Sequence, residues 1–161
     1  MNAEFNVFTM SDHEGALAAA QASEKRWKAG VPLSSIDGVP TTLKDIVYCE
    51  TLDVRYGCKA TNFIPDAADA PSVSRLRDAG AVLLGLTIMP EFGWKAVTDN
   101  PRNLITRNPW DPTKTPGGSS GGRQRNNPIH LRQQNFSLRG FAVTVKPSHR
   151  KCRLFQKNNA D

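Results

Sequence analysis

Residues 71–87 read PSVSRLRDAGAVLLGLT, and this stretch carries the clearest structural signal in the chain. Pro71 suits the first turn of a helix over residues 73–79, and Gly80 suits its end. The apolar run at residues 81–87 has the length and composition of a strand that is buried on both faces, which is typical of parallel sheets. A helix that leads directly into such a strand indicates an α/β fold.

A second candidate strand lies upstream, where residues 39–43 read VPTTL and Lys44 follows at the end of the run. Strand, helix and strand in this order predict a βαβ crossover, in which the two strands are parallel. Residues 49–70 show no sustained period, and residues 89–115 hold four prolines and two tryptophans. We expect irregular chain in both segments.

Another helix is predicted over residues 12–29, which read DHEGALAAAQASEKRWKA. Most of these residues are good helix formers. Ser11 or Asp12 can cap the first turn, and Gly30 can end the last turn in a left-handed conformation.

The charge distribution divides the chain at Gly122. Residues 1–122 hold 12 Lys and Arg against 14 Asp and Glu, whereas residues 123–161 hold 9 Lys and Arg against Asp161 alone. A change this abrupt predicts a domain boundary or a break in the reading frame of the gene. We therefore expect a folded unit over residues 1–122 and a basic tail over residues 123–161.

Cysteine content and hydropathy limit the kind of protein. The three cysteines, Cys49, Cys58 and Cys152, form no C-x-x-C pair, so neither a disulfide framework nor a zinc site is indicated. Charged residues interrupt the N-terminal stretch, and no apolar run is long enough to span a membrane. These features predict a reduced, cytoplasmic protein that has no metal and no membrane partner.

The most chemically specific stretch is the loop at residues 116–122, which reads PGGSSGG. Glycine lacks Cβ, so the backbone can approach a ligand closely while two hydroxyls project from one turn. This arrangement suits acyl transfer, although a flexible Gly/Ser linker has the same composition. A nucleophile elbow at Ser120 is a third interpretation, but it requires an acid and then a histidine in chain order. Asp161 is the only later acid, and it follows both later histidines.

Five segments carry a resemblance to a known family. They are DGVPTTLKD at 37–45, AGAVLLG at 79–85, MPEFG at 89–93, NPWD at 108–111 and TPGGSSGG at 115–122. In this order they resemble the amidase signature enzymes, and an ordered set is far more specific than a lone Gly-Ser loop. The resemblance implies an incomplete amidase-signature-like α/β fold, with a mixed central sheet and flanking helices, in the part of the chain before the basic tail.

The resemblance also implies hydrolysis of a carboxylic amide, at its C–N bond, through a Lys-Ser-Ser triad. Lys44 corresponds to the base and Ser119 to the bridging serine, which has a cis peptide bond. Gly117, Gly118 and Ser120 would then lie against a small-molecule amide substrate, and no cofactor is implied. A lysine has an ordinary pKa of about 10.4, so Lys44 would need burial or a neighbouring cation to act as a base.

The third member of the triad has no counterpart here. In the family, a helix of small residues and an Asp-x-Gly-Gly-Ser segment, which supplies the nucleophile, follow the Gly-Ser loop. Residues 123–128 read RQRNNP, a poor helix start, and Gly140 is the only later glycine. Ser137 and Ser148 have no glycine neighbours. We expect a truncated or frame-shifted family member with little or no amidase activity.

The basic tail leaves one alternative function open. Its nine cations could contact RNA or another polyanion, which would make the protein a non-catalytic binder. Phe136, Phe141 and Phe155 are scattered and form no stacking motif, so nucleic acid is the less favoured partner.

Overall fold

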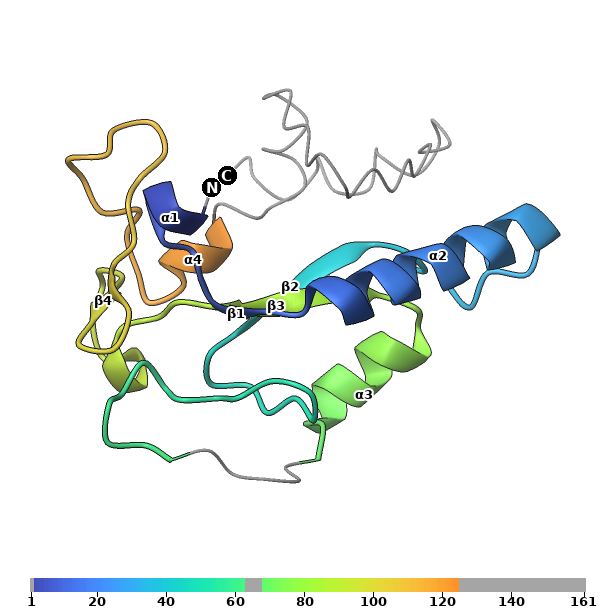
Figure 1. Ribbon diagram of the computed structural model, residues 1–161, viewed down its shortest axis with the longest axis horizontal. Helices are drawn as coiled ribbons and strands as arrows, with labels where there is room; N and C mark the ends of the chain where they lie inside the picture. The colour runs from blue at the N-terminus through green and yellow to red at the C-terminus, as the bar shows by residue number, and fades with distance from the viewer. Residues whose placement is uncertain (1, 63–67, 125–161) are drawn as a thin grey trace, which may run out of the picture.

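The computed structural model describes residues 2–62 and 68–124 (Figure 1). Apart from its first two residues, the predicted basic tail lies outside these ranges. The elements follow in the order α1 (Asn2–Phe5), β1 (Phe8–Ser11), α2 (His13–Ala29), β2 (Pro40–Lys44), α3 (Pro71–Asp78), β3 (Val82–Thr87), the 3₁₀ helix η1 (Glu91–Gly93), β4 (Asp99–Asn100), β5 (Leu104–Ile105) and α4 (Gly121–Gln124).

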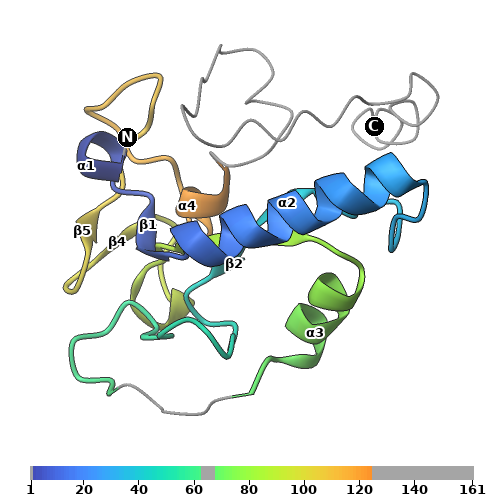
Figure 2. The ribbon, with the colours of Figure 1, turned by 45° about the vertical axis from the view of Figure 1, so that its right-hand side comes forward.

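The main sheet has three strands in the order β1-β3-β2. β3 runs parallel to β2 and antiparallel to β1, so the sheet is mixed. β2, α3 and β3 therefore form the predicted βαβ crossover, and the prediction of an α/β fold with a mixed sheet and flanking helices is confirmed. β4 and β5 form a separate two-stranded sheet, which lies beside α1 (Figure 2).

α2 begins and ends where its capping residues predict. The Asp12 carboxylate accepts a hydrogen bond from the Gly15 N–H at 2.8 Å, which satisfies a donor in the first turn. Gly30 ends the helix with φ 75°, the left-handed conformation that glycine adopts without strain. Ala16 and Ala20 are buried against the sheet, so α2 covers one of its faces.

α3 covers the opposite face of the sheet (Figure 1). Val73, which is fully buried, packs against Leu83 and Leu86 of the central strand. The irregular segment between β2 and α3 adds Cys49, Leu52 and Val54 to the same apolar cluster, which also contains Leu43. This segment has no helix or strand among its described residues, as predicted, but it still closes the larger part of the core.

A register shift in β3 explains how Leu83 and Leu86 face the same cluster although they are three residues apart. Their partners in β2 are only two residues apart, so β3 carries one extra residue at this point. Gly85 lies within this stretch with φ 145°. A Cβ at Gly85 would lie 2.2 Å from the carbonyl oxygen of Met10 in β1, so glycine is required for the two strands to approach each other.

Asp37 joins the end of α2 to the start of β2. Its carboxylate, which is buried, accepts two hydrogen bonds from the Arg26 guanidinium at 2.8 Å and 2.6 Å and one from the Leu33 N–H at 2.9 Å. The bond with Arg26 is the main reason that the pKa of Asp37 lies well below its ordinary value. The first residue of the DGVPTTLKD motif therefore fixes the position of β2.

Four short elements differ from the expectations. β4 and β5 occupy the segment that was expected to be irregular, and each has only two residues. α4 begins at Gly121, where a loop was expected, and includes the first two residues of the predicted tail. β1 gave no signal in the sequence, because its position depends on pairing with β3 rather than on local composition.

Two further properties bear on function. Within residues 2–62 and 68–124, no helix is long and apolar enough to cross a membrane. The same residues contain no group of three or more His, Cys, Asp or Glu side chains that could hold a metal ion.

Candidate active site

The candidate site lies where β2 and β3 end. Lys44 is the last residue of β2 and pairs with Thr87, the last residue of β3. The carboxyl ends of parallel strands commonly border the binding site of an α/β protein. The start of α4 reaches this edge, because a Cβ at Gly122 would lie 3.0 Å from the Cβ of Thr87.

Lys44 and Ser119 are in direct contact. The Lys44 Nζ donates a hydrogen bond to the Ser119 Oγ at 2.8 Å, although 75 residues separate the two along the chain. Both residues are half-buried. The peptide bond between Gly118 and Ser119 is cis, as the family resemblance implied. The structure thus brings together the two residues that were predicted to act as base and bridging serine.

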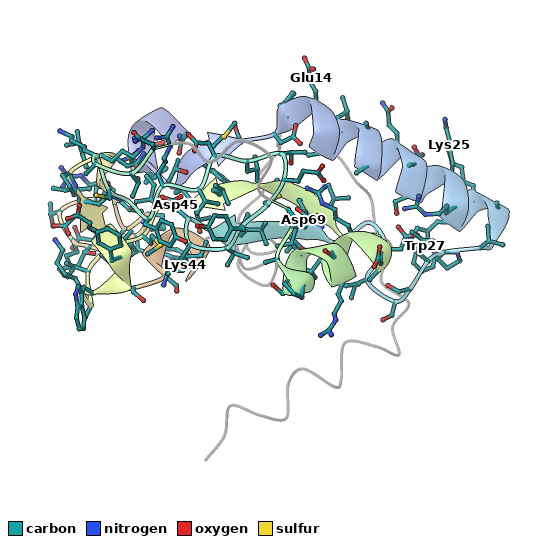
Figure 3. The ribbon with its side chains drawn as sticks, turned by 90° about the horizontal axis from the view of Figure 1, so that it is seen from below. Glu14, Lys25, Trp27, Lys44, Asp45 and Asp69 are labelled. Atoms are coloured by element: carbon teal, nitrogen blue, oxygen red, sulfur yellow. The ribbon has the colours of Figure 1, made fainter. Side chains whose placement is uncertain are left out.

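The surroundings of Lys44 disfavour its charged form. Burial lowers the pKa of Lys44 from its ordinary value, because an ammonium group loses hydration there. The neighbouring Asp45 carboxylate accepts hydrogen bonds from the N–H groups of Arg55 at 2.7 Å and Gly57 at 2.8 Å. Burial raises the pKa of Asp45 despite these bonds. Figure 3 labels the two neighbours at the end of the sheet.

Asp45 has a structural part in the site. It is fully buried, and its backbone N–H donates to the Thr87 carbonyl at 3.2 Å. Its carbonyl accepts from the Tyr56 N–H at 3.0 Å. Through these bonds and its carboxylate, Asp45 fastens residues 55–57 beneath the end of β2. The sequence placed Asp45 in a motif, but gave no sign of this role.

The Gly-Ser loop is held in place rather than free. Gly117 has φ 88°, and a Cβ at Gly118 would lie 2.7 Å from the Val97 nitrogen. Such close contacts with backbone argue against a flexible linker. Gly117, Gly118 and Ser120 are half-buried beside Ser119, and their contact with substrate stays a prediction.

The elbow interpretation of Ser120 gains little from the structure. α4 does follow the loop, as an elbow requires, but the last described strand before it ends at Ile105. Ser137 and Ser148 lie outside the described residues.

Sequence reasoning missed Thr98. This residue is fully buried, and its hydroxyl is hydrogen-bonded to Gly117 and to Gly121, which flank the Gly-Ser turn. No local signal marks Thr98, because it lies in an irregular segment about twenty residues before its partners in the chain.

Comparison with known proteins gives one consistent result. A family model described as Amidase matches residues 1–123. Indoleacetamide hydrolase of Bradyrhizobium diazoefficiens is 41% identical over 122 residues, which cover 76% of this chain and 23% of the relative. A glutamyl-tRNA(Gln) amidotransferase subunit from Azoarcus sp. is 43% identical over 121 residues, which cover 75% of this chain and 25% of the relative.

Solved structures agree with these relatives. A protein from a vestigial complex that reveals the origins of an s-triazine catabolic enzyme has a TM-score of 0.70 and 39% identity over 76% of this chain and 27% of its own. The peptide amidase of Stenotrophomonas maltophilia has a TM-score of 0.65 and 31% identity over 73% of this chain and 25% of its own. The chain therefore spans about a quarter of the length of the proteins that it matches.

Proposed function

The chain belongs to the amidase family, and from this we propose that residues 1–122 form the proton-transferring part of an amide hydrolase. Lys44 is the base in this proposal, and Ser119 is the bridging serine. The observation that carries it is the 2.8 Å contact between the Lys44 Nζ and the Ser119 Oγ, at the ends of two parallel strands.

The proposed proton path is the one that the family resemblance implies, and the Lys44–Ser119 contact supports its first step. Neutral Lys44 accepts the proton of the Ser119 hydroxyl, and Ser119 in turn accepts the proton of a nucleophilic serine. That serine attacks the carbonyl carbon of a carboxylic amide, and an ester to the enzyme forms. The amine leaves with the proton returned from Lys44 through Ser119, after which water cleaves the ester by the same route. The lowered pKa of Lys44 supports this role, because it increases the neutral fraction of the amine.

The nucleophile must come from a third segment. No Gly-Gly-Ser sequence follows Gly122 within the 161 residues, so we expect this chain alone to hydrolyse no amide. Removing one member of a triad that acts as a unit abolishes most of its rate enhancement.

The free thiols of Cys49 and Cys58 support a reducing, cytoplasmic location.

A chimaera tests the proposal. Residues 1–122 replace the matching segment of the Bradyrhizobium diazoefficiens indoleacetamide hydrolase, whose remaining three quarters would supply the nucleophile. We expect the chimaera to hydrolyse indoleacetamide, and we expect Lys44→Ala and Ser119→Ala each to lower kcat by about 10³-fold or more. Lys25→Ala is the control, because Lys25 is exposed on α2 and lies well apart from Lys44 (Figure 3).

Two results would overturn this function. One is a folded chimaera, verified by circular dichroism, that hydrolyses no amide although the intact relative does so under the same conditions. The other is a Lys44→Ala chimaera as active as the Lys25→Ala control.

The basic tail supports a second candidate, namely binding of RNA or another polyanion. Residues 123–161 carry nine Lys and Arg against one acid. Binding through these cations would weaken steeply with salt, because it depends on counterion release. Titration of the chain with polyuridylate at several salt concentrations measures this, and affinity that ignores salt would contradict it.

A further inference from the structure

Thr98 lies beneath the Gly-Ser loop and is fully buried. Its Oγ1 donates a hydrogen bond to the Gly117 carbonyl at 2.7 Å and accepts one from the Gly121 N–H at 3.0 Å. Gly117 and Gly121 are the residues on either side of the turn that contains Ser119. A single hydroxyl therefore ties both ends of this turn together.

Thr98 is itself held firmly. Its carbonyl accepts a hydrogen bond from the Thr106 N–H at 3.0 Å. The Thr115 Oγ1 lies 3.4 Å from the Thr98 nitrogen and 3.3 Å from the Gly117 nitrogen, and accepts a hydrogen bond from both. The residues before Thr98 touch the loop directly, since a Cβ at Gly118 would lie 2.7 Å from the Val97 nitrogen. The Gly-Ser loop thus packs against the backbone of residues 97–98, which Thr106 holds in place through its hydrogen bond to the Thr98 carbonyl.

Gly121, at the C-terminal end of the turn, packs closely against the Thr98 side chain. A Cβ at Gly121 would lie 2.3 Å from the Thr98 Oγ1, closer than such atoms can approach. Both the hydroxyl of Thr98 and the missing side chain of Gly121 are therefore needed for this contact.

We propose that Thr98 is a positioning residue for amide hydrolysis, whose hydroxyl holds the Gly-Ser turn so that the Ser119 Oγ stays against the Lys44 Nζ. This inference rests on the proposed function. The Thr98 hydroxyl is hydrogen-bonded to the backbone of Gly117 and Gly121 rather than to Lys44 or the Ser119 side chain, so it acts through the backbone of the loop. A displacement of about 1 Å at a reacting group can cost about a hundredfold in rate.

The test uses the 161-residue chain with isotope-labelled lysine, and follows the Lys44 resonance with pH by NMR. Thr98→Val removes the hydroxyl at nearly constant volume. We expect its loop to leave Lys44, so that the titration midpoint of Lys44 moves up toward the ordinary lysine value. A rise of one pH unit in the Lys44 midpoint lowers the neutral fraction of the amine at neutral pH about tenfold. Thr98→Ser keeps the hydroxyl and should restore the midpoint of the unaltered chain.

Thr106→Val is the matched control. Thr106 is equally buried, and its Oγ1 donates to the Asn6 carbonyl at 2.8 Å rather than to the loop. Its loss should lower stability but leave the Lys44 midpoint unchanged. Gly121→Ala is an independent variant, because its methyl group forces the Thr98 hydroxyl away and should shift Lys44 as Thr98→Val does. If Thr98→Val does not fold, Gly121→Ala and Thr98→Ser decide the question.

The positioning role and the amidase function fail in different ways. In the chimaera, Thr98→Val should lower kcat by about a hundredfold with little change in KM. Hydrolysis that is unaffected by Thr98→Val, with an unchanged Lys44 midpoint, would overturn the positioning role and leave the function intact. A shifted Lys44 midpoint in a chimaera that hydrolyses no amide would overturn the function alone.

Discussion

Lys44 shows how an ordinary residue type acquires a specific chemistry from its place in the fold. It ends a strand, so its position is set by the sheet, and its amine is half-buried against Ser119. Burial disfavours the ammonium form and lowers the pKa of the group. Asp37 and Asp45, in the same nine-residue motif, have structural tasks, because each carboxylate binds backbone N–H groups.

The pH dependence of the chimaera should report Lys44. A base acts when it is deprotonated, so kcat/KM should rise with pH and level off above the pKa of Lys44. Because burial lowers that pKa, the midpoint of the rise should lie below the ordinary lysine value of about 10.4. Initial rates of indoleacetamide hydrolysis across pH measure it. A midpoint at or above the ordinary value would show that Lys44 is not the group that titrates.

At the scale of elements, the sequence was informative where structure is local. α2 and α3 were predicted from their caps, stops and composition, and β3 from its apolar run. β1 was missed because its position is specified by its distant partner, β3. β4 and β5 were missed because each has only two residues, too few to show a period. The contact between Lys44 and Ser119 was predicted through the family resemblance, since no local pattern links residues that far apart. Thr98 offered neither kind of signal.

Gly85, at the register shift in β3, should matter for the free energy of unfolding. Gly85→Ala places a methyl group against the Met10 carbonyl and should separate β1 from β3. We expect a cost of about 3 kcal/mol or more, because the backbone conformation at φ 145° costs about 1–3 kcal/mol on its own for a residue other than glycine. Gly30→Ala is the matched control, because Gly30 also has a positive φ but no atom within 4 Å of its added Cβ. It should cost about 1 kcal/mol. Urea unfolding of both variants measures the difference, and equal losses would contradict the close approach of the strands.

At the scale of the whole molecule, large apolar side chains gather on one exposed segment. Between residues 92 and 110, the exposed fractions are 54% for Phe92, 88% for Trp94, 69% for Leu104 and 68% for Trp110. Exposed apolar residues grouped in this way favour association with other surfaces. The same segment supports the Gly-Ser loop through Thr98.

We therefore expect the chain to self-associate as its concentration rises. A double variant, Trp94→Lys with Leu104→Lys, should shift the sedimentation profile toward the monomer. Leu33→Lys is the control, because Leu33 is similarly exposed, at 55%, but lies outside the segment. Sedimentation velocity over a range of concentrations compares the three proteins. Association that persists in the double variant and disappears in Leu33→Lys would show that the associating surface lies outside residues 92–110.

The hydrogen bond from Thr106 to Asn6 has a consequence for synthesis of the protein on the ribosome. These residues are 100 positions apart, so this bond cannot form until residue 106 has left the exit tunnel. β1 waits in the same way for β3, which is more than seventy residues downstream. Contacts of such long range slow folding, because the intervening chain must first be closed into a loop. Residues 6–11 are therefore translated long before the partners that hold them in the fold.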